Sequence, residues 1–420
     1  MSIDFSHIPS SIKEKSNSEL ITSILIFRAV RYKWLIRFGQ AVLPYVLWIP
    51  GIKFLIRKTV FNHFCGGETL DETKKVIRNL AAHHVNAISD YSAEQAGTKE
   101  KQEETRKNIL QSIRFAGQQK NVPFACVKIT GICARPLLEK ISGQEPLDEQ
   151  EQQARKEFIE RLDALCGAAA EQGKKIFIDA EETWINPAIN EAAEMMMAKY
   201  NREKHVVYTT VQFYTTDSLA YLQRLIDTAS YKVALKLVRG AYHEQENERA
   251  AKMGYPTPIL PNKDAVDRNF NEGLRVCIKN LGKVSFCAAT HNTGSVELLM
   301  QLMKDHHVEA DSDIVSFSQL YGMRDNLTYE LAGNGYNVSK YIPYGPLKET
   351  LPYLIRRAQE NAGISEQMGD ELQLLLKEKQ TRKSSRQSQT PAVAALLRAE
   401  RNNPEQSEIK KLEIPKTKQS

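Results

Sequence analysis

Three features of the sequence predict an α/β fold: a (βα)8 TIM-type barrel with an N-terminal helical and hydrophobic arm and a disordered basic C-terminal tail. From about residue 70 of the 420, short apolar runs alternate with longer amphipathic stretches, as in parallel sheets whose strands are buried on both faces. Eight such pairs fill about 290 residues, close to the usual size of a (βα)8 barrel. No GxGxxG or GxxxxGKS/T loop occurs, which disfavours an open, doubly wound nucleotide-binding sheet.

Each strand candidate is a short run rich in Val, Ile, Phe and Ala, the composition of a buried strand. In chain order the strands are expected at 85–89, 123–129, 175–179, 206–212, 232–238, 284–289, 313–317 and 338–342. Each strand is followed by an amphipathic stretch long enough for a helix. These helices are expected near 99–118, 149–171, 188–200, 217–229, 264–280, 294–305, 324–332 and 346–361.

Charge divides the chain into three parts. The predicted arm (1–69) and the predicted polar tail (371–420) flank the barrel (70–370). Residues 1–60 carry 9 Lys and Arg against 3 Asp and Glu, and the tail carries 11 against 6. The remainder of the chain is mildly acidic, so we expect no nucleic-acid binding by the barrel.

The segment 28–58 mixes Trp and aliphatic residues with Lys and Arg. Its uncharged run from Phe38 to Ile52 contains Pro44 and Pro50, and it is too short and too broken to span a bilayer. Basic flanks beside such residues fit a peripheral membrane contact. An arm packed on the protein's own body explains the pattern equally well, and both interpretations stay open.

Cysteine and histidine patterns predict no metal. The six cysteines include no CxxC pair and the nine histidines form no HExxH motif, so neither a disulfide framework nor a zinc site is expected. The N-terminal residues lack a secretory signal and the Arg-rich, acid-poor composition of a transit peptide. We therefore expect a reducing compartment.

Nearly every predicted strand ends in polar or aromatic residues. In a (βα)8 barrel the carboxyl ends of the strands form the active site. One buried Lys or Asp is often a structural ion pair, but seven elements with functional groups at the same end favour a site. The strand-end residues are Lys128, Asp179, Glu181, Glu182, Gln212, Lys236, Arg239, Tyr242, Thr290, His291, Asn292, Gln319 and Tyr341.

The last predicted helix carries Tyr353, Arg356, Arg357 and Glu360 at i, i+3, i+4 and i+7, which places them on one face. Two adjacent guanidinium groups are suited to bind a carboxylate in bidentate fashion, and Lys128 would add a third cation. The alternative is a solvated face with an Arg–Glu pair worth a few tenths of a kcal/mol.

Seven motifs between Asn62 and Asn361 make the chain resemble the FAD-dependent proline dehydrogenases, in particular the monofunctional branch. They are DYSAE (90–94), VKITG (127–131), FIDAEET (177–183), KLVRGAY (236–242), ATHN (289–292), QLYGM (319–323) and YIPYGPLKETLPYLIRRAQEN (341–361). The resemblance implies a barrel whose eighth helix covers the strand ends. It also implies oxidation of L-proline to Δ1-pyrroline-5-carboxylate, the first step of proline catabolism to glutamate, with electrons passing from FAD to a membrane quinone.

The resemblance also implies roles for individual residues. Hydride would leave the ring carbon next to nitrogen for flavin N5, with Asp179, Lys236, Lys128 and Tyr341 as the catalytic positions. The substrate positions would be Lys128, Leu237, Ala241, Tyr242, Tyr341, Tyr353, Arg356, Arg357 and Glu360. Neighbouring cations should lower the pKa of Asp179, so water is the expected proton acceptor.

The family's flavin contacts correspond to Ala180, Gln212, Lys236, Arg239, Gly240, Ala241, Thr290, His291 and Asn292, with Lys263 near the pyrophosphate. Lys236 stands where many members have Arg, and Arg239 where they have Lys, so both charges are kept but the forked guanidinium group moves. Glu94 corresponds to a position that can pair with the eighth-helix arginines as part of a gate. The expected location is a bacterial cytoplasm, peripheral to the inner membrane, or the mitochondrial inner membrane in a eukaryote.

Three alternatives stay open. Hydroxyproline dehydrogenase is the sister activity, which the bulk of Tyr341 disfavours. A lyase on the same barrel would use Lys128 to form a Schiff base, but would leave the flavin motifs without a purpose. An inactive membrane-associated scaffold would be expected to have lost charged strand-end residues, and none is lost.

Overall fold

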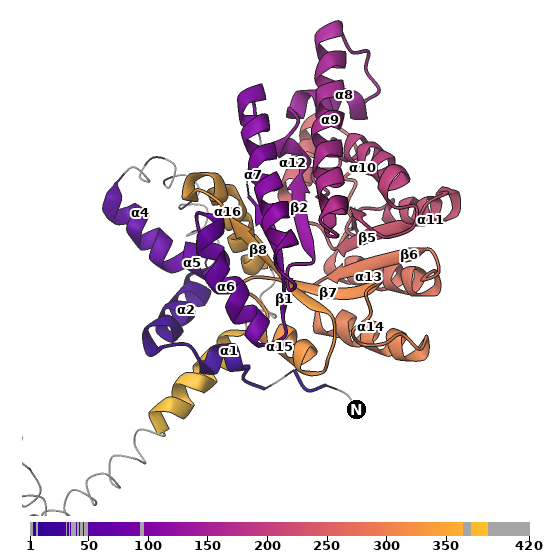
Figure 1. Ribbon diagram of the computed structural model, residues 1–420. Helices are drawn as coiled ribbons and strands as arrows, with labels where there is room; N and C mark the ends of the chain where they lie inside the picture. The colour runs from indigo at the N-terminus through magenta and orange to yellow at the C-terminus, as the bar shows by residue number, and fades with distance from the viewer. Residues whose placement is uncertain are drawn as a thin grey trace, which may run out of the picture.

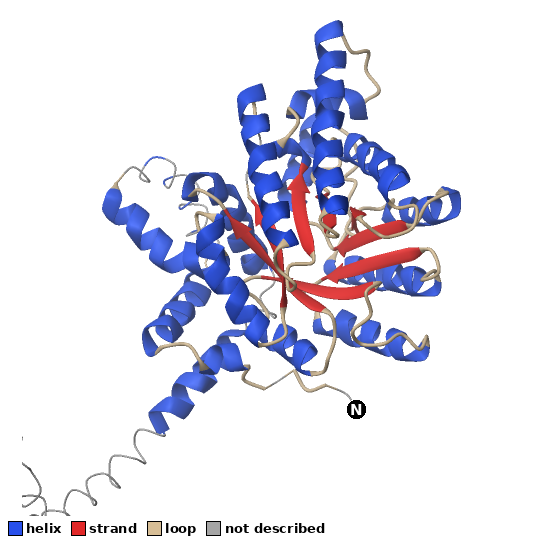
Figure 2. Ribbon diagram, viewed as in Figure 1, coloured by secondary structure: helices blue, strands red, loops and turns tan. Residues whose placement is uncertain are grey.

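The computed structural model describes residues 3–5, 7–30, 32, 34, 39, 42, 45, 49–92, 96–363 and 371–384. Its centre is a closed barrel of eight parallel strands in sequential order, shown with its surrounding helices in Figures 1 and 2. The fold class is therefore confirmed. The strands are β1 (Asn86–Tyr91), β2 (Phe124–Lys128), β3 (Lys175–Asp179), β4 (Val207–Gln212), β5 (Val233–Val238), β6 (Val284–Ala289), β7 (Val315–Leu320) and β8 (Val338–Tyr344).

Seven of the helices that follow the strands pack on the outside of the barrel, whereas the eighth, α16, contributes residues to the cavity at the carboxyl ends of the strands. Within the described residues, every predicted strand and helix is present and has its ends within three residues of the prediction. These helices are α7 (Lys99–Gly117), α9 (Glu149–Glu171), α10 (Asn186–Tyr200), α11 (Ser218–Thr228), α13 (Lys263–Lys279), α14 (Thr293–Asp305), α15 (Asp325–Gly333) and α16 (Leu347–Gly363).

Short elements that the sequence did not predict lie in the loops and before the barrel. A 3-10 turn (Ile129–Gly131) and α8 (Arg135–Ser142) follow β2, and α12 (His243–Met253) follows β5. Helix α6 (Leu70–Ala82) precedes β1, and the Thr69 side chain caps it by accepting from the backbone N–H of Glu72.

Side chains on each strand alternate between two cores. On β2, Ala125 and Val127 belong to the large core between barrel and helices, whereas Phe124 and Cys126 point into the barrel. Inside the barrel Phe124 stacks on Phe177 with ring centroids 4.2 Å apart. This aromatic layer fills the interior, so the polar side chains that follow it are held at the carboxyl ends of the strands.

The described parts of the N-terminal arm are largely helical, and several of them pack on the protein's own body. Most of the stretch 31–48, within the predicted membrane-contact segment, lies outside the described residues. The arm comprises α1 (Ser10–Lys13), α2 (Asn17–Val30), α4 (Pro50–Ile56), a π-helix (Arg57–Phe61) and α5 (Asn62–Phe64). Its buried residues form a second core with α16 and with residues 371–384. Helix α4 is the exception, because none of its residues is buried. None of the helices in the described part of the chain is long and apolar enough to cross a bilayer.

The prediction of a disordered tail from residue 371 is wrong for its first part. Residues 371–384 are helical, shown in yellow beside α1 in Figure 1. Leu372, Leu374 and Leu375 are buried in the second core, and this burial offsets the entropy cost of ordering a segment whose other residues are mostly polar. The remainder of the predicted tail, 385–420, lies outside the described residues.

Candidate active site

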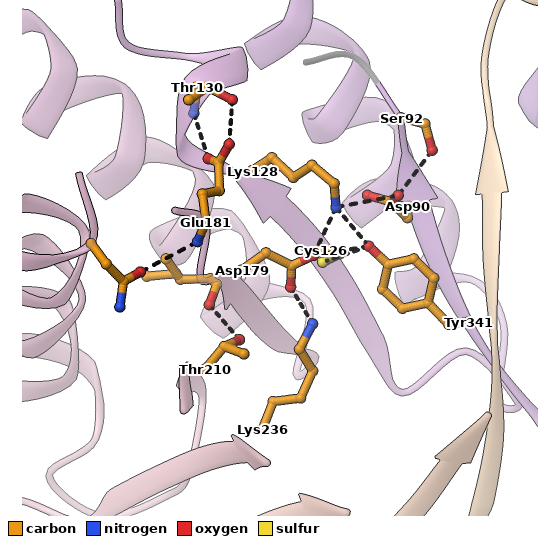
Figure 3. Close-up of polar contacts among 12 residues, drawn as sticks. Asp90, Ser92, Cys126, Lys128, Thr130, Asp179, Glu181, Thr210, Lys236 and Tyr341 are labelled. Atoms are coloured by element: carbon orange, nitrogen blue, oxygen red, sulfur yellow. Dashed lines mark hydrogen bonds and ion pairs between the residues drawn. The ribbon is translucent and has the colours of Figure 1, made fainter. Parts of the chain in front are cut away.

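Four predicted catalytic residues meet at the carboxyl ends of β2, β3, β5 and β8 (Figure 3). Lys128 Nζ donates to Asp179 Oδ2 at 2.8 Å, and Tyr341 OH donates to the same oxygen at 3.0 Å. The ammonium of Lys236 pairs with the other carboxylate oxygen, Oδ1. The parallel register places Lys128 directly beside Asp179 on the neighbouring strand. The four side chains therefore form one hydrogen-bonded floor.

Burial and neighbouring charges determine the protonation of this floor. Burial alone would raise the pKa of Asp179, but the ammonium groups of Lys128 and Lys236 outweigh it and hold that pKa well below its usual range. Burial disfavours charged Lys236, yet the carboxylate of Asp179 keeps its pKa above the usual value. Burial, and then Asp179, raises the pKa of Tyr341 well above its normal range. Asp179 is therefore ionised, Lys236 charged and Tyr341 a protonated donor.

Asp90, to which the sequence analysis gave no role, lies beside the ammonium group of Lys128 in this network (Figure 3). It is 0% exposed, its Oδ2 lies 3.8 Å from Lys128 Nζ, and it accepts a hydrogen bond from Ser92 Oγ at 2.9 Å. Burial raises the pKa of Asp90, although Lys128 opposes the shift. The sequence contained a signal for Asp90, because it lies near the carboxyl end of β1. The other polar strand-end residues were assigned to the site on that criterion.

A cavity of about 620 Å³ opens above the floor, within the usual size range of small-molecule and cofactor sites. Its wall is built from strand ends, the β5–α12 connection, the first residues of α13 and one face of α16. The predicted residues that line it are Lys128, Asp179, Ala180, Gln212, Lys236, Arg239, Gly240, Ala241, Tyr242, Lys263, Thr290, His291, Asn292, Tyr341, Tyr353, Arg356 and Arg357.

Helix α16 brings two guanidinium groups to this cavity. The Arg356 guanidinium carbon lies 5.7 Å from the centroid of the Tyr242 ring, and that of Arg357 lies 5.3 Å from the Tyr353 ring. These aromatic neighbours hold the arginines by cation–π contact. The side chain of Glu360 and all of Glu94 lie outside the described residues, so these two predictions stay untested.

Leu237 does not reach the cavity. It is fully buried in the large core between barrel and helices, and Val238 lines the cavity instead. Because successive strand side chains point to opposite faces, Lys236 facing the interior forces Leu237 outward. The predicted substrate contact by Leu237 is therefore wrong, and the alternation along β5 explains why.

Glu181 and Glu182 also turn away from the cavity. Glu181 accepts from the backbone N–H and hydroxyl of Thr130, at 2.9 and 2.6 Å, and Glu182 pairs with Arg135 at 3.0 Å. They tie the loop after β3 to the one after β2. Their structural role leaves Asp179 as the carboxylate that lines the cavity at this strand end.

Another part of the cavity wall contains cations and hydrogen-bond donors, among them Arg239, Lys263 and Asn292. Arg239 Nε donates to Asp267 Oδ1 at 2.7 Å, and Lys263 Nζ donates to Oδ2 of the same carboxylate at 2.8 Å. Asn292 caps α14 through its side chain. Such a set of cations and helix-end donors suits a phosphate-containing group.

His291 brings an unsatisfied ring nitrogen to the cavity lining, and Gly240 brings its backbone close to an aromatic ring. No described atom hydrogen-bonds to Nδ1 of His291, and burial, followed by nearby cations such as Lys340, holds the pKa of this imidazole well below its usual value. The backbone of Gly240 has φ +125°, and a Cβ there would lie 2.3 Å from the Tyr214 ring. Only glycine allows this close approach. Among the described residues, no cluster of three or more His, Cys, Asp or Glu could hold a metal ion.

Residues 73–370 match the family described as proline dehydrogenase. Proline dehydrogenase 1, mitochondrial, of Dictyostelium discoideum is 29% identical over 74% of this chain and 63% of its own length. The hydroxyproline dehydrogenase of Xenopus laevis is 28% identical over 87% of each chain. Proline utilization A from Bdellovibrio bacteriovorus has the same fold, with a TM-score of 0.67 and 19% identity over 84% of this chain and 38% of that protein. This chain thus spans less than two thirds of the Dictyostelium relative.

Proposed function

The chain belongs to the proline dehydrogenase family, and on this premise we propose that it oxidises L-proline to Δ1-pyrroline-5-carboxylate with FAD as cofactor. The observation that carries the proposal is the convergence of Lys128, Arg356 and Arg357 on one cavity floored by Asp179 and Tyr341. Three cations suit the carboxylate of a small amino acid. The relative named proline dehydrogenase 1 supports the choice of substrate.

The residues present fit FAD. Arg239 and Lys263, both held by Asp267, would bind its phosphates. The unsatisfied Nδ1 of His291 would bind a polar group of the cofactor. Gly240 lines the cavity with its backbone packed against the Tyr214 ring, and Ala180, Gln212, Lys236, Ala241, Thr290 and Asn292 would complete the site. When bound, FAD would supply a hydride acceptor at N5 and a route for the electrons to a quinone.

The protein's residues would act chiefly by orientation. Arg356 and Arg357 would hold the substrate carboxylate, while Tyr242, Tyr341 and Tyr353 would enclose the ring between aromatic walls. Fixing the ring in one position makes the transfer effectively intramolecular, which supplies much of the rate enhancement. Asp179 would position Lys128, Lys236 and Tyr341 through its three hydrogen bonds.

The amine of proline must lose a proton before or during hydride loss. Asp179 is a poor base, because Lys128 and Lys236 keep its pKa low and its oxygens already accept three hydrogen bonds. We therefore assign the proton to water that enters the cavity. Asp179 then stays ionised throughout and keeps the floor in place.

A peripheral membrane contact would bring the enzyme to its quinone. Helix α4 exposes Phe54 by 63% and Leu55 by 60%, and Lys58 lies 5.7 Å from the Phe54 ring centroid. Apolar side chains beside Lys and Arg are suited to an anionic lipid surface. The expected location is the cytoplasmic face of a bacterial inner membrane, or the mitochondrial inner membrane in a eukaryote.

Hydroxyproline oxidation is the second candidate, favoured by the Xenopus relative. Tyr341 argues against it, because its hydroxyl is held by Asp179 and its ring is 8% exposed, leaving little freedom to make room for a ring hydroxyl. A Schiff-base lyase is disfavoured because two carboxylates within 4 Å stabilise Lys128 as an ammonium, whereas a nucleophilic lysine must be neutral.

An anaerobic visible spectrum tests the proposal. Flavin bands that bleach with L-proline, and much less with trans-4-hydroxyproline, are the expected result. Bleaching with hydroxyproline alone would assign the sister activity. Purified protein that binds no flavin when supplied with FAD would contradict both.

A further inference from the structure

Helix α16 lies between the cavity and the second core. Arg356 and Arg357 line the cavity, whereas Leu354 packs into the second core with Phe61, Phe64 and the tail helix. On the side away from the cavity, the helix that carries the proposed carboxylate-binding groups therefore packs in a core formed with the N-terminal arm and residues 371–384.

The tail helix, residues 371–384, is attached at both of its ends. Glu371 is 7% exposed, and its carboxylate accepts a hydrogen bond from the backbone N–H of Arg324 at 2.9 Å. At the other end Arg382 donates to the backbone oxygen of Lys13 at 2.9 Å and to Asn17 Oδ1 at 3.0 Å. Between these ends Leu372, Leu374 and Leu375 are buried in the second core.

Arg324 connects Glu371 to the cavity wall, because its backbone and its guanidinium group make separate hydrogen bonds. This residue has the left-handed φ of +53° and precedes α15, so its N–H has no acceptor within that helix. Its guanidinium donates to Thr293, the first residue of α14, next to the cavity residues His291 and Asn292. One residue thus joins the tail helix to the cavity wall.

We propose that residues 371–384 act as a strap that holds α16 on the mouth of the barrel, with Glu371 as a positioning residue that fastens it. The proposal rests on the proposed function only in that Arg356 and Arg357 would bind the substrate carboxylate. The holding of α16 is a structural claim that can be measured without any substrate.

The charges around Glu371 make the strap sensitive to pH. Arg324 faces it from the β7–α15 connection, Asp325 from the start of α15 and Lys340 from β8. Lys15 and His63 of the arm face Asp325. Burial lowers the pKa of His63 to about 3, so the imidazole stays neutral. Lys340 pairs with Asp325 at 2.8 Å, which leaves Glu371 without a dedicated cation among these groups.

Burial, and then the charge of Asp325, raises the pKa of Glu371 to about 7. Because the docked carboxyl has a higher pKa than the same group in water, docking is favoured at low pH and weakens as pH rises through about 7. Between pH 6 and pH 8 the docking equilibrium should fall about tenfold. A neutral Gln at this position should abolish the change.

Limited trypsin digestion measures the holding of α16 directly, since Arg356 and Arg357 lie within it. Leu375→Glu should release the strap and increase cleavage after these arginines about tenfold. Gln373→Glu is the matched control, because it adds the same charge at an exposed position of the same helix. Wild-type cleavage there should rise from pH 6 to pH 8, relative to a peptide substrate, and Glu371→Gln should remove the rise.

Kinetics then connects the strap to the substrate. Leu375→Glu should raise the KM for L-proline about fivefold and change kcat by less than about twofold, as expected for lost ground-state positioning. The strap proposal would be overturned if Leu375→Glu left cleavage at Arg356 and Arg357 unchanged. It would also be overturned if cleavage of Glu371→Gln rose from pH 6 to pH 8 as much as cleavage of the wild type. If Leu375→Glu does not fold, the Glu371→Gln comparison still decides. Normal strap behaviour in a protein that oxidises no proline would contradict only the proposed function.

Discussion

The ammonium nitrogen of Lys128 lies 2.8 Å from Oδ2 of Asp179, at neighbouring positions of β2 and β3. Both side chains are almost fully buried, so neither charge is satisfied by bulk water. A buried ion pair of this kind seldom adds net stability, but removal of one partner leaves an uncompensated charge. The pair therefore explains why the floor of the cavity is sensitive to single substitutions.

Asp179→Asn should inactivate the protein while also destabilising it. The substitution leaves Lys128 and Lys236 without their shared counter-charge, which should lower the free energy of unfolding by about 3–5 kcal/mol. We expect kcat for L-proline to fall at least about 100-fold, because the floor loses its common acceptor. Steady-state kinetics and urea unfolding measure the two effects. Glu181→Gln, which alters a neighbouring carboxylate outside the cavity lining, should keep kcat within about threefold, and an equal loss there would refute the role of Asp179.

Arg356→Met should weaken proline binding without releasing FAD. A hydrogen bond to a charged group contributes about 1.5–3 kcal/mol, so the KM for L-proline should rise about 10- to 100-fold. The flavin absorbance per protein should stay constant. Lys348→Met is the control, because it removes an exposed cation from the same helix. An unchanged KM in Arg356→Met would remove this residue from the carboxylate site.

Tyr341→Ser should shift selectivity toward trans-4-hydroxyproline. The smaller side chain makes room for a ring hydroxyl, and differences of this size in a pocket change selectivity about 10- to 200-fold. The ratio of kcat/KM for the two substrates measures the shift. Tyr341→Phe keeps the ring but loses the hydrogen bond to Asp179, so it should lower kcat without changing the ratio. A shift of equal size in Tyr341→Phe would show that volume is not the cause.

Gly240→Ala should abolish flavin binding. An alanine Cβ would collide with the Tyr214 ring at 2.3 Å and would need a φ of +125° that L-residues rarely adopt. The absorbance of bound flavin after reconstitution with FAD is the measurement. Gly282→Ala is the comparison, since no atom lies within 4 Å of the added methyl group there. Retention of full flavin in Gly240→Ala would show that the close packing of Gly240 against Tyr214 is not needed to shape the flavin site.

Replacement of Phe54 and Leu55 by Ser should reduce binding to vesicles that contain anionic lipid. Each buried apolar side chain contributes about 1.5–3 kcal/mol, so co-sedimentation should fall at least about tenfold. Proline oxidation with a soluble acceptor should be unaffected. Met195 and Met253 are exposed apolar side chains elsewhere on the surface, and their double replacement by Ser controls for general hydrophobicity. Unchanged co-sedimentation of the α4 variant would disprove the membrane contact.

Local patterns in the sequence were sufficient for the eight strands and the helices that follow them. Hydrophobic periodicity depends only on neighbouring residues, so β5 and α9 were placed within a residue or two of their ends. The same patterns placed Lys128, Asp179, Lys236 and Tyr341 at strand ends. The rule that the strand ends of a barrel share one face then predicted a common site.

Tertiary structure decided which side chains face the cavity and what supports them. Leu237 turned outward because Lys236 points inward: side chains alternate along any strand, but the closed barrel decides which face of β5 is the inner one. Asp90 lies next to Lys128 of the floor only because β1 closes the barrel against β2 and β8. The polar segment 371–384 became a helix because its leucines meet α16 and the N-terminal arm. Sequence alone thus determined the eight strands, the helices that follow them and the strand-end chemistry. Contacts between distant residues, which no local pattern encodes, determined the helix at 371–384 and the orientation of the site.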